Sequence, residues 1–138
     1  MASKKNGQSN IGQVIIPVAH PNPPEAHEVE AARVLALHFG CEVKFLIPVD
    51  DYKRKTPDIA MLGLEWEIKS PRGSSKRSTI RSQFANAKGK SKHLIIDGQN
   101  TPLDDGFVIN KLHAEIRKRQ SVKKLIYITK ERKVLDIR

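Results

Sequence analysis

The sequence predicts a single α/β domain in which helices flank a mixed central sheet. Segments with apolar residues at helical spacing alternate along the chain with short runs rich in β-branched residues, which is the pattern of a protein that combines helices and strands. The chain has 138 residues, a usual size for one domain with its own core. It contains no internal repeat and no long linker. We therefore expect one domain over residues 11–138, preceded by a flexible basic tail at residues 1–10.

The first expected elements are a strand or packed arm, a helix and another strand. Residues 11–18 contain a β-branched stretch, and the prolines that follow it cannot lie within a helix. From Glu25 the apolar residues recur at helical spacing, acidic residues occupy the first turns, and Gly40 is placed as a C-cap. Residues 43–49 then have the β-branched and aromatic composition of a strand.

A tight hairpin is expected next. Two strand-like runs, residues 58–62 and 64–70, are separated only by Gly63. The loop that follows, residues 71–78, is rich in Arg, Gly, Ser and Lys. This composition is typical of a mobile segment that contacts phosphate groups.

The rest of the chain predicts a basic helix, a buried strand, a second helix and a closing hairpin. A continuous apolar run indicates the buried strand, and apolar residues that recur on one side indicate each helix. The expected ranges are 79–88 for the basic helix, 94–96 for the strand, a start at Asp104 for the second helix, and 125–129 and 134–137 for the hairpin.

The charge of the chain favours a polyanionic partner. Lys and Arg together number 25 against 15 Asp and Glu, which gives a net charge of +10. Nucleic acid is the first candidate partner and an anionic membrane is the second. No apolar run approaches the roughly 20 residues of a membrane-spanning helix, and no apolar segment follows the N-terminal lysines as it does in a secretory signal. We expect a cytoplasmic protein without a membrane partner.

A site for phosphodiester hydrolysis is predicted on the hairpin. Glu67 and Lys69 are two residues apart on one strand and therefore share a face. A turn near Gly63 would bring Asp58 back beside them. Mg²⁺ prefers carboxylate ligands completed by water and substrate phosphate, and a nearby lysine can orient the attacking water or stabilise developing charge. The alternative is a surface ribbon with solvated charges.

Glu28 is the candidate for a third carboxylate. It lies near the N-terminal end of the first helix, on a partly inward face. Its alternative role is that of a first-turn acid that interacts favourably with the helix dipole.

The hairpin motif resembles the signature of the PD-(D/E)XK phosphodiesterase superfamily. Pro57-Asp58 is followed nine residues after the aspartate by Glu67-Ile68-Lys69. The order helix, three strands, helix, strand over residues 25–97 is similar to the restriction-endonuclease-like core of that superfamily. Within it, the chain resembles the C-terminal nuclease toxins of contact-dependent growth inhibition systems. The stretches that carry this likeness are Glu28-x-x-x-Ala32-x-x-Leu35, Lys55-Thr56-Pro57-Asp58, Glu67-Ile68-Lys69-Ser70-Pro71 and Leu94-Ile95-Ile96-Asp97.

The resemblance implies a role for each candidate residue. Asp58 and Glu67 would hold Mg²⁺ or another divalent cation such as Mn²⁺, Lys69 would serve the attacking water, and Glu28 would complete the acidic cluster. The helix after Glu-x-Lys borders the site in this superfamily, which implies substrate contacts there, although a solvated basic face is the alternative. The candidate substrate-binding residues are Arg72, Arg77, Arg81, Gln83 and Lys88.

Three functions remain open from the sequence. By resemblance, the first is a metal-dependent tRNase toxin that is delivered into a target cell and has an immunity protein as a partner. The second is a DNA endonuclease of a repair, restriction or mobile-element system, because phosphate contacts do not distinguish ribose from deoxyribose. The third is a non-catalytic nucleic-acid-binding module. The carboxylate pair argues against this module, since acids near phosphate repel it unless a metal intervenes.

Overall fold

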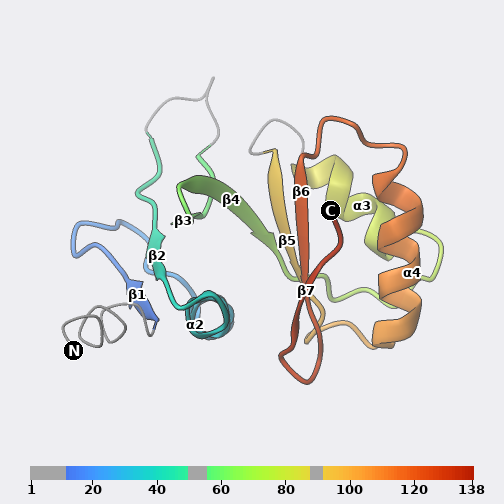
Figure 1. Ribbon diagram of the computed structural model, residues 1–138, viewed down its shortest axis with the longest axis horizontal. Coiled ribbons are helices and arrows are strands. Elements are labelled where there is room, and N and C mark those ends of the chain that lie inside the picture. The colour runs from blue at the N-terminus through green and yellow to red at the C-terminus, as the bar shows by residue number, and fades with distance from the viewer. Residues whose placement is uncertain (1–11, 50–55, 88–91) are drawn as a thin grey trace, which may run out of the picture. The chain divides into compact units, whose positions relative to one another are not determined.

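The chain folds as two compact units, Met1–Glu65 (unit 1) and Trp66–Arg138 (unit 2). A computed structural model describes residues 12–49, 56–87 and 92–138 (Figure 1). The expected tail at residues 1–10 lies outside these ranges, as does Lys55 of the stretch Lys55-Thr56-Pro57-Asp58. The expectation of one domain over residues 11–138 stays a prediction.

Unit 1 combines a small mixed sheet with one helix. Strand β2 pairs parallel with β1 and antiparallel with β3, and helix α2 packs against β1 and β2. The elements are β1 (Gln13–Ile15), α2 (Ala26–Phe39), β2 (Glu42–Phe45) and β3 (Ile59–Met61). The core of this unit consists of apolar residues of α2 and of the inward side chains of the strands: Ala31, Ala32, Leu35, Ala36, Val43, Phe45, Ile59 and Met61.

The boundaries of α2 follow the local sequence. Glu25 is the N-cap, and Gly40 closes the helix in the left-handed conformation (φ 60°) while its N–H donates to the carbonyl of Ala36. Both ends were predicted from acidic first-turn residues and from the position of the glycine. Strand β2 is shorter than the predicted range of residues 43–49, since regular pairing ends at Phe45, before Pro48, which has no N–H to donate to a ladder.

Unit 2 contains a four-stranded mixed sheet and two helices. Strands β4, β5 and β6 run parallel, and β7 pairs antiparallel with β6. The elements are β4 (Leu64–Lys69, of which the first two residues belong to unit 1), α3 (Thr79–Ala87), β5 (His93–Asp97), α4 (Asp105–Ile116), β6 (Lys124–Ile128) and β7 (Val134–Asp136). Figure 1 shows α3 and α4 together on one side of β5 and β6.

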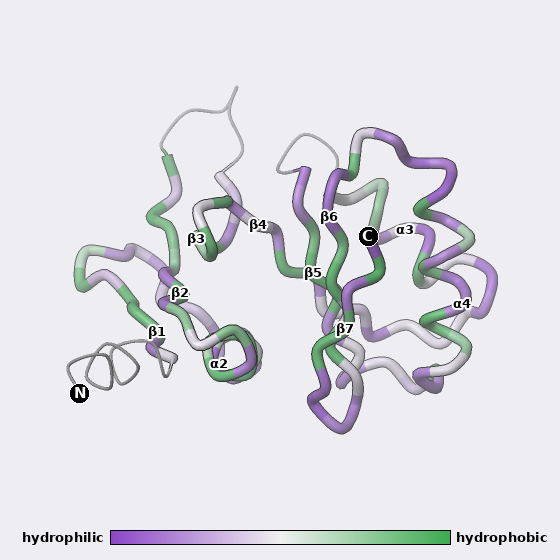
Figure 2. The backbone as a smooth tube through the Cα atoms, viewed as in Figure 1, coloured by the Kyte–Doolittle hydropathy of each residue, from purple (hydrophilic) through white to green (hydrophobic). Residues whose placement is uncertain are grey.

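The core of unit 2 lies between the sheet and the two helices. It contains Ile80 and Phe84 of α3 together with residues from β5, α4 and β6, namely Leu94, Ile96, Val108, Leu112, Ile116, Leu125 and Tyr127. The central parts of β5 and β6 are accordingly hydrophobic in Figure 2. The predicted buried strand at residues 94–96 and the predicted apolar side of the second helix are both confirmed. Burial of each large aliphatic side chain contributes roughly 1.5–3 kcal/mol.

The mixed α/β class predicted from the sequence is confirmed. Within the described ranges, no helix combines the length and the apolar character needed to cross a bilayer.

Candidate functional site

A two-residue turn joins β3 to β4. Leu62 and Gly63 both have left-handed backbone conformations, with φ values of 54° and 76°. Two positive φ values in succession are typical of the tight turns that connect antiparallel strands. The predicted turn at Gly63 is therefore present, with Leu62 as its first residue and Gly63 as its second.

Asp58 precedes β3 in unit 1. Its backbone carbonyl accepts a hydrogen bond from the N–H of Leu46 at 2.9 Å, which extends the contact between β2 and β3 by one step. The Asp58 side chain is half-buried. Its carboxylate is therefore positioned by an ordered backbone rather than by a free loop.

Glu67 and Lys69 form a largely buried ion pair on β4. The Nζ atom of Lys69 lies 3.3 Å from Oε2 of Glu67, and the two side chains are 19% and 2% exposed. Carboxylates are rarely buried to this degree unless a cation compensates the lost hydration. The ion pair agrees with the prediction that these two side chains share one face of the strand.

The register of the parallel strands shows to which face of the sheet Glu67 and Lys69 project. Glu67 is paired with Leu94, and Lys69 with Ile96. Both β5 residues belong to the core beneath α3 and α4, and register partners in a ladder project to the same side. Glu67 and Lys69 therefore lie on the face that α3 and α4 cover.

Glu28 takes part in capping α2. Its Oε1 atom accepts a hydrogen bond from the backbone N–H of Glu25 at 2.8 Å, and the N-cap side chain completes a reciprocal capping box. The side chain is half-buried. Glu28 therefore acts in this structure as a first-turn acid of the helix. This role is the alternative to metal binding that the sequence leaves open.

The candidate substrate-binding residues differ in exposure. Arg72, Arg77 and Arg81 are exposed, whereas Gln83 is half-buried and its amide donates to the carbonyl of Thr79 at 3.0 Å. Lys88 lies outside the described residues. The three arginines therefore present their charge to solvent, while the Gln83 amide is already engaged within α3.

Hydrogen bonds hold the loop that precedes α3. The hydroxyl of Thr101 donates to the carbonyl of Gly73 at 2.6 Å, and the N–H of Ser75 donates to Oγ1 of Thr79 at 3.0 Å. This segment has the composition of a mobile loop, yet its backbone is fixed to the loop after β5 and to the start of α3.

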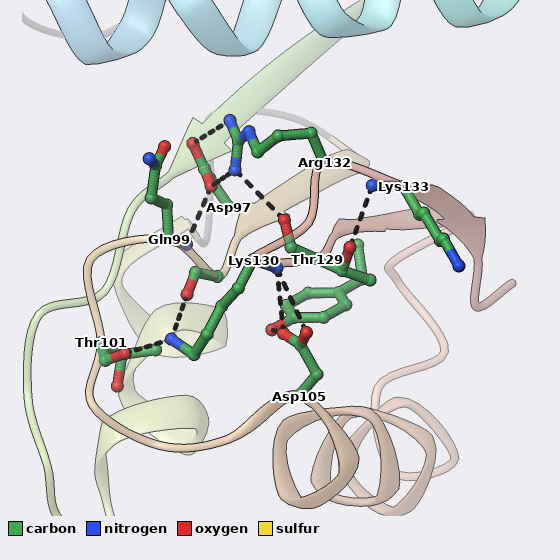
Figure 3. Close-up of polar contacts among 10 residues, drawn as sticks. Asp97, Gln99, Thr101, Asp105, Thr129, Lys130, Arg132 and Lys133 are labelled. Carbon is green, nitrogen blue, oxygen red and sulfur yellow. Dashed lines mark hydrogen bonds and ion pairs between the residues drawn. The ribbon is translucent and has the colours of Figure 1, made fainter.

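A second polar group, which was not predicted from the sequence, lies at the carboxyl end of β5 (Figure 3). The Asp97 carboxylate is 1% exposed and accepts two hydrogen bonds from the guanidinium of Arg132 and one from the N–H of Gln99. In the sequence, only the position of Asp97 directly after an apolar run indicates this group. No local pattern identifies Arg132, which lies in the β6–β7 turn, as the partner of Asp97.

Asp105 and Lys130 extend this polar group. Asp105 accepts hydrogen bonds from the hydroxyl of Tyr127 at 2.7 Å and from the N–H of Lys130 at 3.2 Å. The Nζ atom of Lys130 in turn donates to the carbonyls of Gly98 and Thr101. Burial, followed by the hydrogen bond to Asp105, raises the pKa of the Tyr127 phenol, so that this group stays protonated. The network ties the β6–β7 turn to the loop after β5.

Within the described ranges, no group of three or more His, Cys, Asp or Glu side chains gathers as a metal site. A divalent cation that keeps most of its water shell needs only one or two protein carboxylates.

Residues 55–134 match the contact-dependent growth inhibition CdiA C-terminal domain family, over more than half of the chain. The chain belongs to this family. The matched range includes Asp58, Glu67, Lys69, Asp97 and Arg132, whereas Glu28 lies outside it.

One solved structure adds to the family match. The fold is similar to that of a chain in the CdiA-CT/CdiI toxin and immunity complex from Burkholderia pseudomallei, with a TM-score of 0.63 and 17% sequence identity. The match covers 91% of this CdiA C-terminal domain and 98% of the other chain. A comparison with curated protein sequences gave no match.

Proposed function

We propose that this CdiA C-terminal domain is a toxin that acts as a metal-dependent endonuclease with a PD-(D/E)XK type of site, and that tRNA is its favoured substrate. The observation that carries the proposal is the buried Glu67 carboxylate 3.3 Å from the Lys69 ammonium on β4. A buried acid and a lysine, two residues apart on a strand, are the groups that the Glu-x-Lys half of the motif requires.

The proposed metal ligands are Asp58 and Glu67. Both supply hard oxygen donors, which fit Mg²⁺ or Mn²⁺ better than a soft metal. Asp58 enters the proposal through its sequence position, because it directly precedes β3 and only Leu62 and Gly63 separate β3 from β4. When bound, a divalent cation supplies charge neutralisation at the scissile phosphate and lowers the pKa of a water molecule. Glu28 is proposed as an auxiliary carboxylate.

The proposed role of Lys69 is to orient the attacking water and to stabilise charge. Its ammonium is held 3.3 Å from Glu67, and its side chain keeps 19% of its surface exposed, so that the side chain is held in place without being fully enclosed. A cation held in this way stabilises the developing negative charge of a phosphodiester transition state without rearrangement.

The substrate preference is supported by charge and by family. Arg72, Arg77 and Arg81 are exposed after β4 and are proposed to bind phosphate groups. Gln83 and Lys88 complete the proposed set. The preference for tRNA over DNA rests on the resemblance to nuclease toxins.

An immunity protein is the proposed protein partner. The similar fold from Burkholderia pseudomallei comes from a toxin and immunity complex. A cell that makes such a toxin requires a protein that binds and neutralises it.

The test is cleavage by purified protein. Wild type, Glu67→Gln and Lys69→Met are incubated with total tRNA, plasmid DNA and single-stranded DNA, with Mg²⁺, Mn²⁺ or a chelator. Glu65→Gln is the matched control, because Glu65 is an exposed acid on the same strand. We expect metal-dependent tRNA cleavage by wild type and control, and a loss of at least about 100-fold in both site variants. Cleavage that persists in both site variants overturns the site, and cleavage of DNA alone overturns the tRNA preference.

A further inference from the structure

We propose that one end of unit 2 binds the phosphodiester backbone of a nucleic acid. This end, here called the cationic end, lies where β5 and β6 begin and α4 finishes. Five exposed basic side chains form it: Lys92, Arg117, Lys118, Lys123 and Lys124. The choice of nucleic acid among polyanions rests on the proposed nuclease function, but the surface itself follows from the contacts of unit 2.

Backbone contacts hold these cations together. The N–H groups of Lys123 and Lys124 donate to the carbonyl of Lys92 at 2.7 Å and 3.3 Å. This places the residue before β5 directly beside the residues that begin β6. The segment from α4 to β6 is also among the hydrophilic parts of the chain in Figure 2.

Arg138 fixes the other side of the cationic end. Its guanidinium donates to the carbonyls of Ile116, Arg119 and Val122, at 3.0 Å, 3.1 Å and 2.7 Å. The chain between α4 and β6 is therefore closed onto the C-terminal residue. Arg117 and Lys118 lie at the start of this closed segment, so that their positions relative to Lys123 and Lys124 are set by ordered backbone.

The neighbouring acids do not cancel this charge. Glu115 is 2% exposed and is shared by Lys111, Lys118 and Arg119, whose cationic atoms lie 3.8 Å, 3.8 Å and 3.3 Å away. Part of the positive charge complements the carboxyl end of α4, where the helix dipole favours cations. That effect fades within one turn and does not account for Lys92, Lys123 and Lys124, which lie at or just before the starts of β5 and β6.

The sheet register connects the cationic end with the proposed site. Glu67, Leu94 and Leu125 lie in one row across β4, β5 and β6. Lys124 is the residue next to Leu125, and two strand spacings of about 4.8 Å each separate its strand from β4. Lys124 pairs with His93 in the neighbouring row, so its side chain projects to the face of the sheet opposite Glu67. The cationic end therefore lies close to the row of Glu67 along the strands without sharing its face, and a nucleic acid bound at Glu67 reaches it by passing around the end of the sheet.

The test compares two triple variants of equal charge. Lys118→Gln, Lys123→Gln and Lys124→Gln together remove three charges from the cationic end. Arg33→Gln, Lys44→Gln and Lys133→Gln together remove three exposed charges elsewhere. Binding of a labelled RNA duplex and of a DNA duplex of equal length is measured in a chelator, over a range of salt concentrations.

We expect the first triple variant to bind both duplexes about 10-fold more weakly or worse at about 0.1 M salt, with a salt slope reduced by about 2–3. The control triple should change affinity by no more than about 2-fold to 3-fold. Equal losses in the two variants overturn the proposal, since only net charge would then matter. A first triple variant that binds nucleic acid as tightly as wild type also overturns the proposal. If that variant instead loses binding to an acidic protein, the surface serves a protein partner and the proposal is likewise overturned.

This outcome is separable from that of the nuclease test. Binding in a chelator requires no cleavage, so wild-type binding that depends on the cationic end supports the surface even where no cleavage occurs with Mg²⁺. A difference in affinity between the RNA and DNA arms identifies which backbone the surface prefers.

Discussion

The guanidinium of Arg132 donates two hydrogen bonds to the buried carboxylate of Asp97, over 2.8 Å and 3.2 Å. Arg132 makes this contact from the left-handed conformation, with φ at 67°, in a turn that the N–H of Arg132 closes onto the carbonyl of Thr129 at 2.9 Å. A left-handed residue with a side chain costs about 1–2 kcal/mol relative to the right-handed form. The paired charge therefore holds an arginine at a position that glycine would occupy without strain.

Replacement of Arg132 should separate the ion pair from the backbone strain. Arg132→Ala removes the partner of a buried carboxylate and should lower the free energy of unfolding by about 3–5 kcal/mol. Arg132→Gly loses the same partner but relieves the strain, so its loss should be smaller by about 1 kcal/mol. Urea denaturation of the two variants measures the difference.

The double variant Asp97→Asn with Arg132→Gly is the control for this prediction. It removes the buried charge together with its partner and should regain part of the stability lost in Arg132→Gly. If Arg132→Ala and Arg132→Gly are equally stable, the backbone at this position is not strained. If the double variant is less stable than Arg132→Gly, Arg132 does not stabilise the fold by compensating the buried charge of Asp97.

Gly98 should not accept a side chain. A Cβ atom at this position would overlap the phenol oxygen of Tyr127, and Tyr127 is fully buried and bonded to Asp105. Gly98→Ala must displace this ring and should cost about 1–3 kcal/mol of folding free energy. Thermal denaturation checks the prediction.

Gly106→Ala is the matched control, because its Cβ would meet only Oδ1 of Asp104 at 3.6 Å. Gly106 lies in the first turn of α4, where alanine is favoured over glycine by roughly 0.5–1 kcal/mol. We expect a melting temperature equal to or above that of wild type. A Gly98→Ala variant as stable as Gly106→Ala would mean that Tyr127 does not fill this space.

Tyr127 should make the fold sensitive to alkaline pH. Its pKa is raised in the folded state by burial and by the hydrogen bond to Asp105, whereas an unfolded tyrosine titrates near about 10. Above that pH the unfolded chain loses this proton first, so the folded state binds more protons and the free energy of unfolding falls as pH rises. The contribution is complete below about pH 10 and is lost as the pH rises toward the folded-state pKa.

Tyr127→Phe provides the comparison, since Asp105 still accepts from the N–H of Lys130. The stability advantage of wild type over this variant should shrink between about pH 9 and pH 11. An advantage that stays constant over this interval would show that the phenol does not titrate with unfolding.

Elements with a clear apolar period could be predicted from the sequence. The helix predicted to start at Asp104, which is α4, and the strand predicted at residues 94–96 have apolar residues that are buried as expected. The pairing of Glu67 with Lys69 also follows from local geometry, because side chains two residues apart on a strand project to the same side. In these cases the deciding interaction lies within one element.

The polar group around Asp97 could not be predicted, because its side chains come from parts of the chain that are far apart in the sequence. Asp97 and Arg132 are 35 residues apart in the sequence, and Asp105 and Tyr127 are 22 apart. Asp105 stands beside Asp104, where the sequence predicts only the start of a helix, and no local pattern identifies a partner at such a distance. The left-handed conformation of Arg132 had no glycine or asparagine to signal it.

Glu28 offers a final test, because its capping role and its proposed catalytic role respond differently to substitution. Glutamine retains the hydrogen bond of a capping box but carries no charge. Glu28→Gln should therefore leave stability within about 0.5 kcal/mol of wild type, while Glu28→Ala loses the bond to the Glu25 N–H and should cost about 0.5–2 kcal/mol. If Glu28 is an auxiliary carboxylate, both variants lower tRNA cleavage at limiting Mg²⁺ and higher Mg²⁺ restores part of it. If Glu28→Gln cleaves tRNA as wild type does over the whole Mg²⁺ range, Glu28 acts only as a helix cap, and the carboxylates of the site reduce to Asp58 and Glu67.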